Sequence, residues 1–146
     1  MINTEIRTFR ANTSEWGSLV ALEGDASGSR EIPFDIRRVY YIYDVGEGVR
    51  RGFHSHSDLE QVLVCVHGSV KILLKTPFEE EVVTLDSPDK GLYIGPMIWR
   101  EMFDWQDGAV LMVLASKYYD EKDYIRDYAA YEKQAKAYFE ARCDAR

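Results

Sequence analysis

The chain has few cysteines and no long apolar segment, and both features restrict its class. Only two cysteines occur among 146 residues, Cys65 in an apolar stretch and Cys143 near a charged C-terminus. Such a pair is not a disulfide framework, and neither thiol is a good candidate nucleophile. No apolar run approaches the roughly 20 residues that span a bilayer, and the N-terminal stretch has no apolar signal segment. We therefore expect a cytoplasmic protein.

Basic residues are in the minority. Lysine and arginine number 18 against 25 acidic residues, which gives a formal net charge of -7. Nucleic acid and anionic membranes would repel such a chain, so we expect neither as a partner. Hydrophobic residues nevertheless make up 46% of the chain and aromatic residues 13%, enough buriable surface for one folded domain over residues 1–146.

Residues 18–116 alternate short apolar runs with turn residues, a rhythm typical of an antiparallel sandwich or barrel. Within this region "VHGSV" predicts a two-residue hairpin turn, with His67 and Gly68 at positive φ. We therefore predict an all-β fold whose barrel covers about residues 16–116. Its expected strands lie at 18–23, 37–45, 51–56, 61–66, 69–74, 80–85, 91–95, 97–103 and 109–115.

The apolar period changes after residue 116. Aromatic residues then recur at steps of three to four, which predicts a C-terminal α-helix over about residues 120–142. Asp120 or Asp123 is expected to cap its start. We interpret the aromatic stripe as a surface that packs on the exterior of the barrel. It comprises Tyr124, Tyr128, Tyr131, Ala135, Tyr138 and Phe139.

His54 and His56 are the main catalytic candidates. Side chains alternate across a strand, so both histidines face one side, together with Glu60, Val62, Val64 and Val66 if no bulge intervenes. We take that side to be the barrel interior. Imidazole titrates near neutrality, so two of them suit the removal of a proton from carbon and its return to a neighbouring atom. Tyr40, which shares its parity with Arg38 on the adjacent strand, is expected to assist.

A metal site is the alternative use of the histidines. The spacing of Gly48, His54, His56, Glu60 and Gly68 resembles the first motif of the cupins, a family of small β-barrels. In metal-binding cupins a histidine from a second motif completes the ligand set. Here that motif would fall within residues 91–103, which contain no histidine, and Arg100 is a permanent cation that cannot bind a divalent ion. A site of two histidines and one carboxylate remains possible. We predict that the protein uses no metal and no other cofactor.

The basic residues near the predicted strands indicate the charge of a ligand. Guanidinium groups match phosphate oxygens, so a phosphorylated small molecule is the natural interpretation in an acidic chain. The alternative is that some of these residues pair with Asp44, Glu47 and Glu101. The basic residues concerned are Arg37, Arg38, Arg50, Arg51, Lys71 and Arg100.

Four stretches together resemble the nucleotide-linked sugar 3,4-ketoisomerases, cupins that act on dTDP-4-keto-6-deoxy-D-glucose. The likeness covers about residues 16–131 and is carried by "IPFDIRRVYYIYDV", "RGFHSHSDLEQVLVCVHGSVKILL", "TLDSPDKGLYIGP" and "VLMVLASKYYDEKDYIRDY". The resemblance implies a metal-free cupin-type barrel (jelly-roll) and a homodimer with exchanged N-terminal strands. It also implies a carbonyl shift from C4 to C3 through a cis-enediol, in the biosynthesis of dideoxy-amino sugars.

Residue by residue, the resemblance implies a catalytic pair at His54 and His56. The family's motif arginine falls on Arg51 and its strand tyrosine on Tyr40 or Tyr41. By parity Arg51 shares the face of the histidines only if Gly52 introduces a bulge, and otherwise Arg50 replaces it.

Two departures from the common pattern concern the product. Many members read "RGSL" and "WHEM" where this chain has Trp16 in "WGSL" and Arg100 in "WREM". An aromatic residue paired with arginine resembles the branch that gives the gluco product, so both residues are expected to bind substrate.

Three alternative functions stay open. A nucleotide-sugar 3,5-epimerase would need a histidine paired with an aspartate, and no histidine has an obvious acidic partner in the sequence. A non-catalytic cupin that binds a sugar nucleotide and a metal-dependent dioxygenase are the others.

Overall fold

Two long strands form the centre of the sheet. In the computed structural model, which describes residues 1–144, β6 (Gln61–Lys75) and β9 (Trp99–Ala115) pair antiparallel along most of their length. Their inward side chains, among them Leu63, Ile72 and Leu111, are fully buried in the main apolar cluster. Burial of this alternating apolar face holds the sheet in its curled form.

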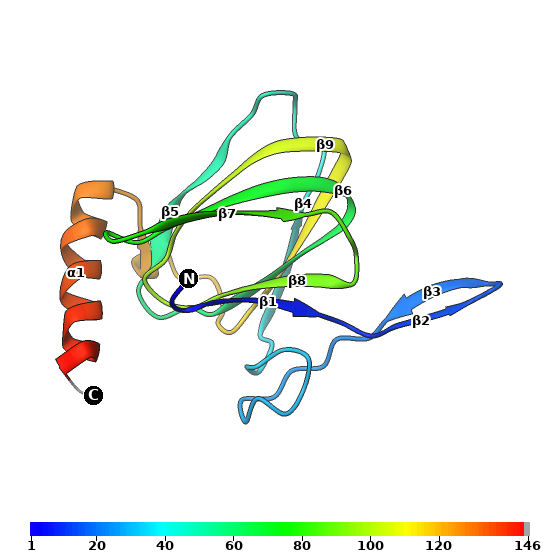
Figure 1. Ribbon diagram of the computed structural model, residues 1–146, viewed down its shortest axis with the longest axis horizontal. Helices are drawn as coiled ribbons and strands as arrows, with labels where there is room; N and C mark the ends of the chain where they lie inside the picture. The colour runs from blue at the N-terminus through cyan, green and yellow to red at the C-terminus, as the bar shows by residue number, and fades with distance from the viewer. Residues whose placement is uncertain (145–146) are drawn as a thin grey trace.

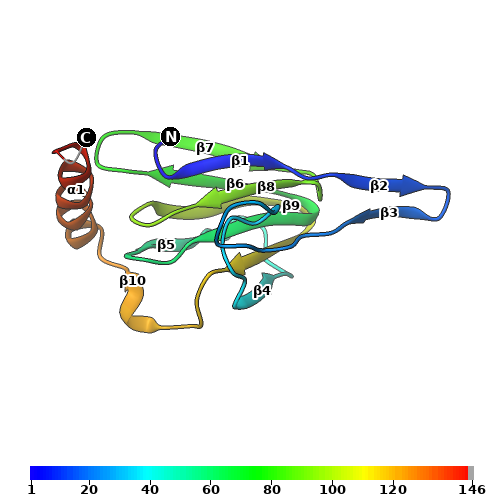
Figure 2. The ribbon, with the colours of Figure 1, turned by 90° about the horizontal axis from the view of Figure 1, so that it is seen from below.

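Six further strands complete this antiparallel sheet, which curls around the main cluster (Figures 1 and 2). The order is β1-β8-β6-β9-β5-β10, while β4 pairs with β9 and β7 pairs with β6. The sheet therefore begins near the N-terminus, earlier than the predicted boundary at about residue 16. The strands are β1 (Thr4–Thr8), β4 (Arg38–Ile42), β5 (Arg51–His56), β7 (Glu80–Leu85), β8 (Lys90–Ile94) and β10 (Tyr124–Ile125).

A two-stranded hairpin projects from the barrel at the end opposite the C-terminal helix (Figure 1). It consists of β2 (Ala11–Ser14) and β3 (Gly17–Val20). The predicted strand at 18–23 is therefore shorter, and it belongs to this hairpin instead of the barrel wall. Trp16 lies in the turn of the hairpin and is 89% exposed.

The hairpin turn predicted at His67 and Gly68 is wrong. The chain continues straight through these residues as part of β6, and the register to β9 shifts on either side of His67. Gly68 has φ 70°, and a Cβ there would lie 2.4 Å from the Gln106 carbonyl oxygen. The glycine thus marks a bulge where β9 approaches closely, and not a reversal of the chain.

The predicted alternation beyond His56 is also wrong. The turn at residues 57–60 breaks the strand, so the odd-numbered residues at the start of β6, Leu63 and Cys65, face the interior. Val62 and Val64 lie on the other side of the sheet, where they pack with Phe9, Ile32 and Phe34 in a second cluster. Parity is a property of one unbroken strand and does not carry across a turn.

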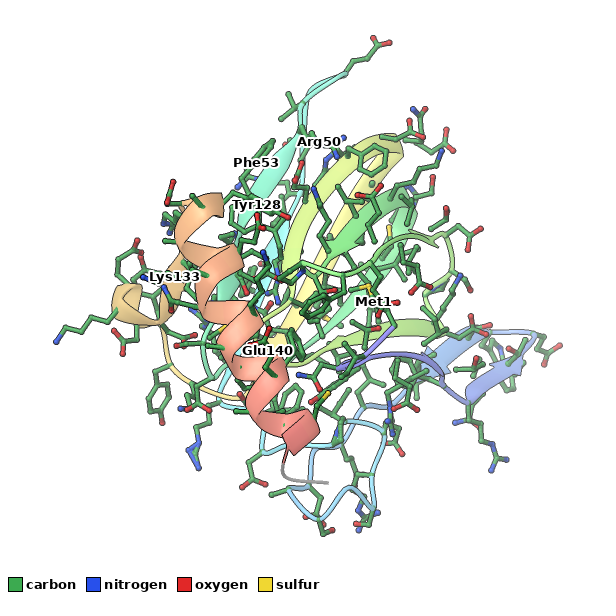
Figure 3. All side chains as sticks on the ribbon, turned by 60° about the vertical axis from the view of Figure 1, so that its left-hand side comes forward. Met1, Arg50, Phe53, Tyr128, Lys133 and Glu140 are labelled. Carbon is green, nitrogen blue, oxygen red and sulfur yellow. The ribbon has the colours of Figure 1, made fainter. Side chains whose placement is uncertain are left out.

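The C-terminal helix α1 spans Tyr128–Asp144 and begins later than predicted. Asp127 caps it, because the Ala130 amide donates to Asp127 Oδ2 at 2.9 Å. Asp120 instead caps the short 3₁₀ helix η1 (Glu121–Asp123), by accepting from the Lys122 amide. Figure 3 shows α1 lying across one end of the sheet, with the Tyr128 side chain beside the strands.

The predicted aromatic stripe packs as expected from Tyr128 onward. Tyr131, Ala135 and Phe139 are buried against the main cluster, and Tyr131 Oη lies 2.8 Å from the Lys75 carbonyl oxygen. Tyr124 does not belong to the helix, because it lies in β10 and pairs with His56 of β5. None of the helices in the described residues is long and apolar enough to cross a membrane.

Candidate active site

The two histidines lie side by side at the end of β5. Their ring centroids are 4.9 Å apart in an edge-on arrangement, and both rings contact Tyr124 of β10. A bulge at Gly52, which has φ 96°, shifts the register between β5 and β9 just before His54. The position requires glycine, because φ is positive and a Cβ there would lie 2.9 Å from the Arg100 carbonyl oxygen.

Both histidines have one ring nitrogen held by an acceptor. His54 Nδ1 lies 3.0 Å from the Gly52 carbonyl oxygen, and His56 Nδ1 lies 2.9 Å from Asp123 Oδ2. Because a carbonyl and a carboxylate only accept, Nδ1 carries the hydrogen in each neutral ring and the Nε2 lone pair is free. His56 Nε2 is buried and has no hydrogen-bond partner among the described residues. Each ring is therefore set to take a proton at Nε2.

Asp123 is the acidic partner that sequence reasoning missed. Its Oδ1 accepts from the Ser57 hydroxyl at 2.6 Å and from the Asp58 amide at 3.0 Å, while Oδ2 faces His56. These two donors hold the carboxylate group in place beside His56. The expectation that no histidine has an acidic partner is thus corrected. Asp123 stands 67 residues after His56 and reaches it only because β10 pairs with β5.

Burial and neighbouring cations keep both imidazoles neutral. Burial first, and then Arg100, lowers the pKa of His54 to about 4. Burial, Arg100 and His54 lower the pKa of His56 in the same direction. The Asp123 carboxylate favours a charged His56 ring, but burial beside several cations outweighs one partly exposed carboxylate. Both rings are therefore bases in their unprotonated form at neutral pH.

A buried arginine lies behind the histidines. Arg100 is 1% exposed, and its Nη1 donates to Gln61 Oε1 at 2.8 Å. Gln61 Nε2 in turn donates to the Tyr40 hydroxyl oxygen at 3.1 Å. Arg100 Nη2 is buried without a hydrogen-bond partner among the described residues. Burial lowers the pKa of Arg100 to about 10, which still leaves it charged at neutral pH. Gln61 was not a predicted site residue. The sequence feature that could have identified it is a polar residue at the first position of an otherwise apolar strand.

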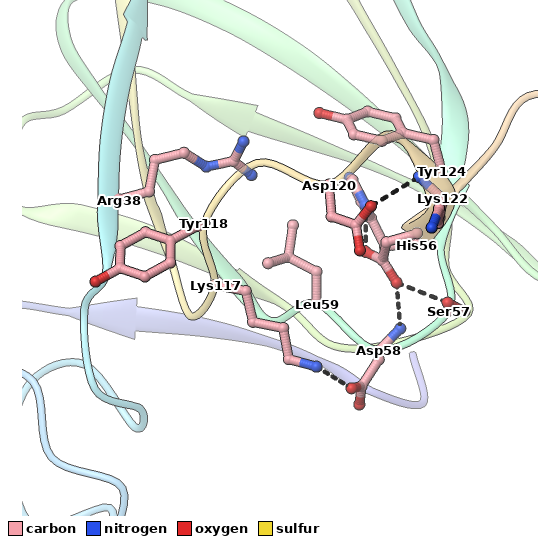
Figure 4. A pocket seen from close by; sticks show the side chains of 11 residues that line it. Arg38, His56, Ser57, Asp58, Leu59, Lys117, Tyr118, Asp120, Lys122 and Tyr124 are labelled. Carbon is pink, nitrogen blue, oxygen red and sulfur yellow. Dashed lines mark hydrogen bonds and ion pairs between the residues drawn. The ribbon is translucent and has the colours of Figure 1, made fainter.

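Two adjoining cavities border this group. The larger, of about 420 Å³, is lined by Tyr40, Arg51, His54 and Arg126 among others. The smaller, of about 240 Å³ (Figure 4), lies on the side of His56 and Asp123. Arg38 and Tyr124 line both. Lys117, Lys122 and Tyr119 also line one cavity or the other, and sequence reasoning named none of these three.

The structure brings most of the predicted site residues together. Arg38, Tyr40, Arg51 and His54 line the larger cavity, and the bulge at Gly52 places Arg51 there despite its parity. The predicted alternative Arg50 instead forms an ion pair with Glu101 at 2.7 Å.

Two predicted substrate-binding residues lie elsewhere. Tyr41 alternates with Tyr40 along β4, so its side chain points to the opposite face and is 64% exposed. Trp16 lies on the projecting hairpin and lines neither cavity of its own chain.

Glu60 does not join the histidines. Its Oε1 accepts from the Tyr93 hydroxyl at 2.7 Å, beside the second apolar cluster. The inward position is taken by Gln61, a neutral amide, and the charged Arg100 lies beside it. The alternative of two histidines with Glu60 as metal ligands is therefore wrong. In residues 1–144 no group of three or more histidine, cysteine, aspartate or glutamate side chains is placed to hold a metal.

The curled antiparallel sheet, with histidines on its inner wall and a C-terminal helix, defines the cupin class. Within that class, residues 2–136 match the family model described as FdtA: WxcM-like, C-terminal. The chain belongs to this family.

Several characterised proteins are similar to it. The TDP-4-oxo-6-deoxy-α-D-glucose-3,4-oxoisomerase of Aneurinibacillus thermoaerophilus is 47% identical over 132 residues, which cover 90% of this chain and 92% of that protein. A histidine-to-asparagine mutant of the 3,4-ketoisomerase QdtA from Thermoanaerobacterium thermosaccharolyticum, in complex with TDP-4-keto-6-deoxyglucose, is 50% identical. That match covers 94% of this chain and 96% of the QdtA chain, with a TM-score of 0.89. The TDP-quinovose 3,4-ketoisomerase WlaRB of Campylobacter jejuni is 44% identical over 91% of this chain and 99% of its own, with a TM-score of 0.85.

Proposed function

We propose that this protein is a sugar-nucleotide 3,4-ketoisomerase that acts on dTDP-4-keto-6-deoxy-D-glucose. The observation that carries the proposal is the pair of neutral imidazoles with free Nε2 atoms, set beside a cavity that Arg38 and Arg51 line. Two of the relatives described above are 3,4-ketoisomerases, one named for TDP-4-oxo-6-deoxyglucose and one solved in complex with TDP-4-keto-6-deoxyglucose, which supports this sugar nucleotide as the substrate.

The reaction moves a carbonyl group without an external oxidant. His54 takes the proton from C3, and the C–H electron pair forms a C3–C4 double bond while the C4 carbonyl oxygen gains a proton. The resulting cis-enediol loses the proton of its C3 hydroxyl, C4 gains a proton, and a C3 ketone remains. C3 is oxidised by two electrons and C4 is reduced by two, so no redox cofactor takes part.

His56 and Tyr40 act on the oxygens at C3 and C4 of the sugar. His56 Nε2 accepts and returns the proton that passes between the C3 and C4 oxygens, because its lone pair is free and its other nitrogen is fixed by Asp123. The Tyr40 hydroxyl and Arg100 stabilise negative charge on the enediolate. Arg38 and Arg51 bind the diphosphate, since guanidinium groups match its oxygens.

The main product is dTDP-3-keto-6-deoxy-D-glucose. Arg100 is always charged and is a poor acid, so it does not deliver a proton to C4 from its own side. Delivery falls to His54, on the face from which the C3 proton left, or to a bound water. The likeness to the TDP-quinovose enzyme supports the same configuration, because quinovose has the gluco configuration at C4.

The protein forms a homodimer with exchanged N-terminal strands in the cytoplasm. An 89% exposed tryptophan on a projecting hairpin is apolar surface that a second chain would cover. In the exchanged arrangement Trp16 joins the cavity of the other chain, where it contacts substrate. Free Cys65 and Cys143 suit a reducing compartment. Light scattering of the purified protein tests the dimer, which requires twice the monomer mass of 16.9 kDa.

The test of the reaction is incubation with dTDP-4-keto-6-deoxy-D-glucose in D₂O, followed by NMR of the product. A 3,4-ketoisomerase yields a 3-keto sugar, with hydrogen at C4 where His54 returns the C3 proton directly and deuterium at C4 where that proton first exchanges with solvent. A 3,5-epimerase, which the His56–Asp123 pair would also suit, retains the 4-ketone and exchanges hydrogen at C5. Unchanged substrate with measurable binding would indicate a non-catalytic sugar-nucleotide-binding protein.

A further inference from the structure

Gln61 lies between two groups of the site and contacts each with a different end of its amide. Its Oε1 is 2.8 Å from Arg100 Nη1, and its Nε2 is 3.1 Å from the Tyr40 hydroxyl oxygen. Gln61 is 1% exposed and Arg100 is also 1% exposed, so water does not compete for these contacts. The arrangement is a buried chain of three side chains.

The direction of every hydrogen bond in this chain is fixed by chemistry. A guanidinium has only donors, so the amide oxygen must face Arg100 and the amide nitrogen must face Tyr40. The amide nitrogen also only donates, so the Tyr40 oxygen is the acceptor of that bond. The Tyr40 proton therefore points away from Gln61. No other side chain or backbone carbonyl in residues 1–144 accepts it, and the tyrosine lines the larger cavity beside His54.

The geometry points to Gln61 as a positioning residue that aims the Tyr40 O–H into the active-site cavity as a hydrogen-bond donor. The inference rests on the proposed ketoisomerase function, in which that donor meets the enediolate oxygen. Arg100 polarises Gln61, Gln61 polarises Tyr40, and each bond strengthens the next. Tyr40 is then a donor to the oxyanion and not the base that removes the C3 proton.

Two substitutions at Gln61 distinguish two roles. In the first, called aiming, Gln61 orients the Tyr40 O–H toward the cavity; in the second, called bracing, Gln61 only holds Arg100 and Tyr40 together. Gln61→Glu keeps the shape and both contacts, and it adds an ion pair with Arg100, but its carboxylate accepts the Tyr40 proton and turns the O–H away from the cavity. Gln61→Met removes both contacts and leaves the hydroxyl free to rotate. Aiming predicts that Gln61→Glu is the more damaging change. Bracing predicts the reverse, because only Gln61→Met loses the bridge.

The measurement is kcat and KM of both variants, in the native background and combined with Tyr40→Phe. We expect Gln61→Glu to lower kcat about 100-fold, as for loss of one oxyanion donor, with KM within about threefold. Gln61→Met should lose about tenfold. In the Tyr40→Phe background Gln61→Glu should add less than a threefold loss. Gln134→Glu, the same substitution on the exposed face of α1, controls for the added charge and should keep native activity.

A second measurement does not depend on turnover. With 3-fluorotyrosine in place of tyrosine, ¹⁹F NMR gives the pKa of residue 40, whose signal Tyr40→Phe identifies. The pKa should rise from native to Gln61→Met and again to Gln61→Glu, since the first change removes a donor and the second adds a carboxylate. An unchanged pKa of residue 40 in both Gln61 variants would overturn the inference. So would a Gln61→Glu variant more active than Gln61→Met, or a roughly 100-fold loss of kcat from Gln61→Glu in the Tyr40→Phe background. If the native protein shows no turnover, the proposed function fails, while the titration still decides the direction of the hydrogen bonds.

Discussion

His56 Nδ1 lies 2.9 Å from Asp123 Oδ2, and this contact determines which nitrogen of His56 faces the substrate. The carboxylate is held by two further donors, Ser57 and the Asp58 amide, so it cannot turn away without breaking both. The pair sets the tautomer of the ring without needing to charge it.

Asp123→Asn should therefore lower kcat by about 100-fold or more, with substrate affinity nearly unchanged. The asparagine amide can donate to Nδ1, which moves the ring hydrogen to Nε2 and removes the free lone pair. ¹⁵N NMR of the imidazole nitrogens reports the tautomer directly. Asp127→Asn is a matched control, because Asp127 caps α1 and asparagine caps helices equally well. A native tautomer with native activity in Asp123→Asn would contradict the positioning role.

His54→Asn should abolish turnover while leaving nucleotide-sugar affinity within about tenfold, since asparagine keeps polarity but has no nitrogen that titrates near neutrality. Calorimetry with a dTDP-sugar measures the affinity. His67→Asn is the matched control, because His67 is exposed on β6 and outside the site. A His54→Asn variant with more than about a tenth of native kcat would transfer the role of base to His56 or Tyr40.

The free energy of unfolding should rise with pH between about 4 and 6.5. The pKa of His54 is lowered to about 4 in the folded chain from 6.5. In that window the unfolded state binds the extra proton, so acid favours unfolding, and the lost stability amounts to about 3 kcal/mol for this residue. His56 acts in the same direction. Urea unfolding at several pH values measures the slope, and His54→Asn should make it shallower. Parallel curves for the two proteins would refute the assignment.

Treatment with a chelator should leave full activity, because the inward position of β6 carries Gln61, and Arg100 beside it is a cation. Metal analysis of the purified protein accompanies the assay. Activity lost on chelation and restored only by a divalent ion would show that the prediction of a metal-free enzyme is wrong.

Trp16→Arg combined with Arg100→His should shift the product toward the galacto epimer. Histidine in place of a buried arginine introduces a group that can release a proton near C4. NMR of the product mixture measures the ratio of epimers. A native protein that already gives the galacto product would contradict the stereochemical assignment but not the ketoisomerase activity.

The alternation of apolar and polar residues predicted most of the strands, but not how the chain connects one strand to the next. The alternation of apolar residues located β5 through β9, because period and burial are encoded within each segment. The sequence did not show that residues 57–60 break the parity between His56 and Gln61, so Glu60 was assigned to the wrong face. The HG pair likewise indicated a turn, since a glycine at positive φ occurs in bulges as well as in hairpins.

Sequence reasoning named the site residues of β4 and β5 together with Arg100 of β9, but not those of the segment before α1. Arg38, Tyr40, Arg51 and His54 are close to one another in the chain and share two strands, so parity and one bulge suffice to group them. Asp123, Tyr124 and Arg126 come from the segment before α1 and join them through the pairing of β10 with β5. A single sequence carries no local sign of that long-range contact.

The segment that holds Asp123 also determines when the enzyme becomes competent during its synthesis. The ribosome releases the barrel strands first, and these can pair and bury their apolar faces as they emerge. Residues 120–126 follow, and the burial of Tyr131, Ala135 and Phe139 on the barrel anchors the chain just beyond them. Until that last stretch leaves the exit tunnel, the nascent barrel has Arg38, Arg51 and His54 but lacks Arg126 and the carboxylate that sets the tautomer of His56.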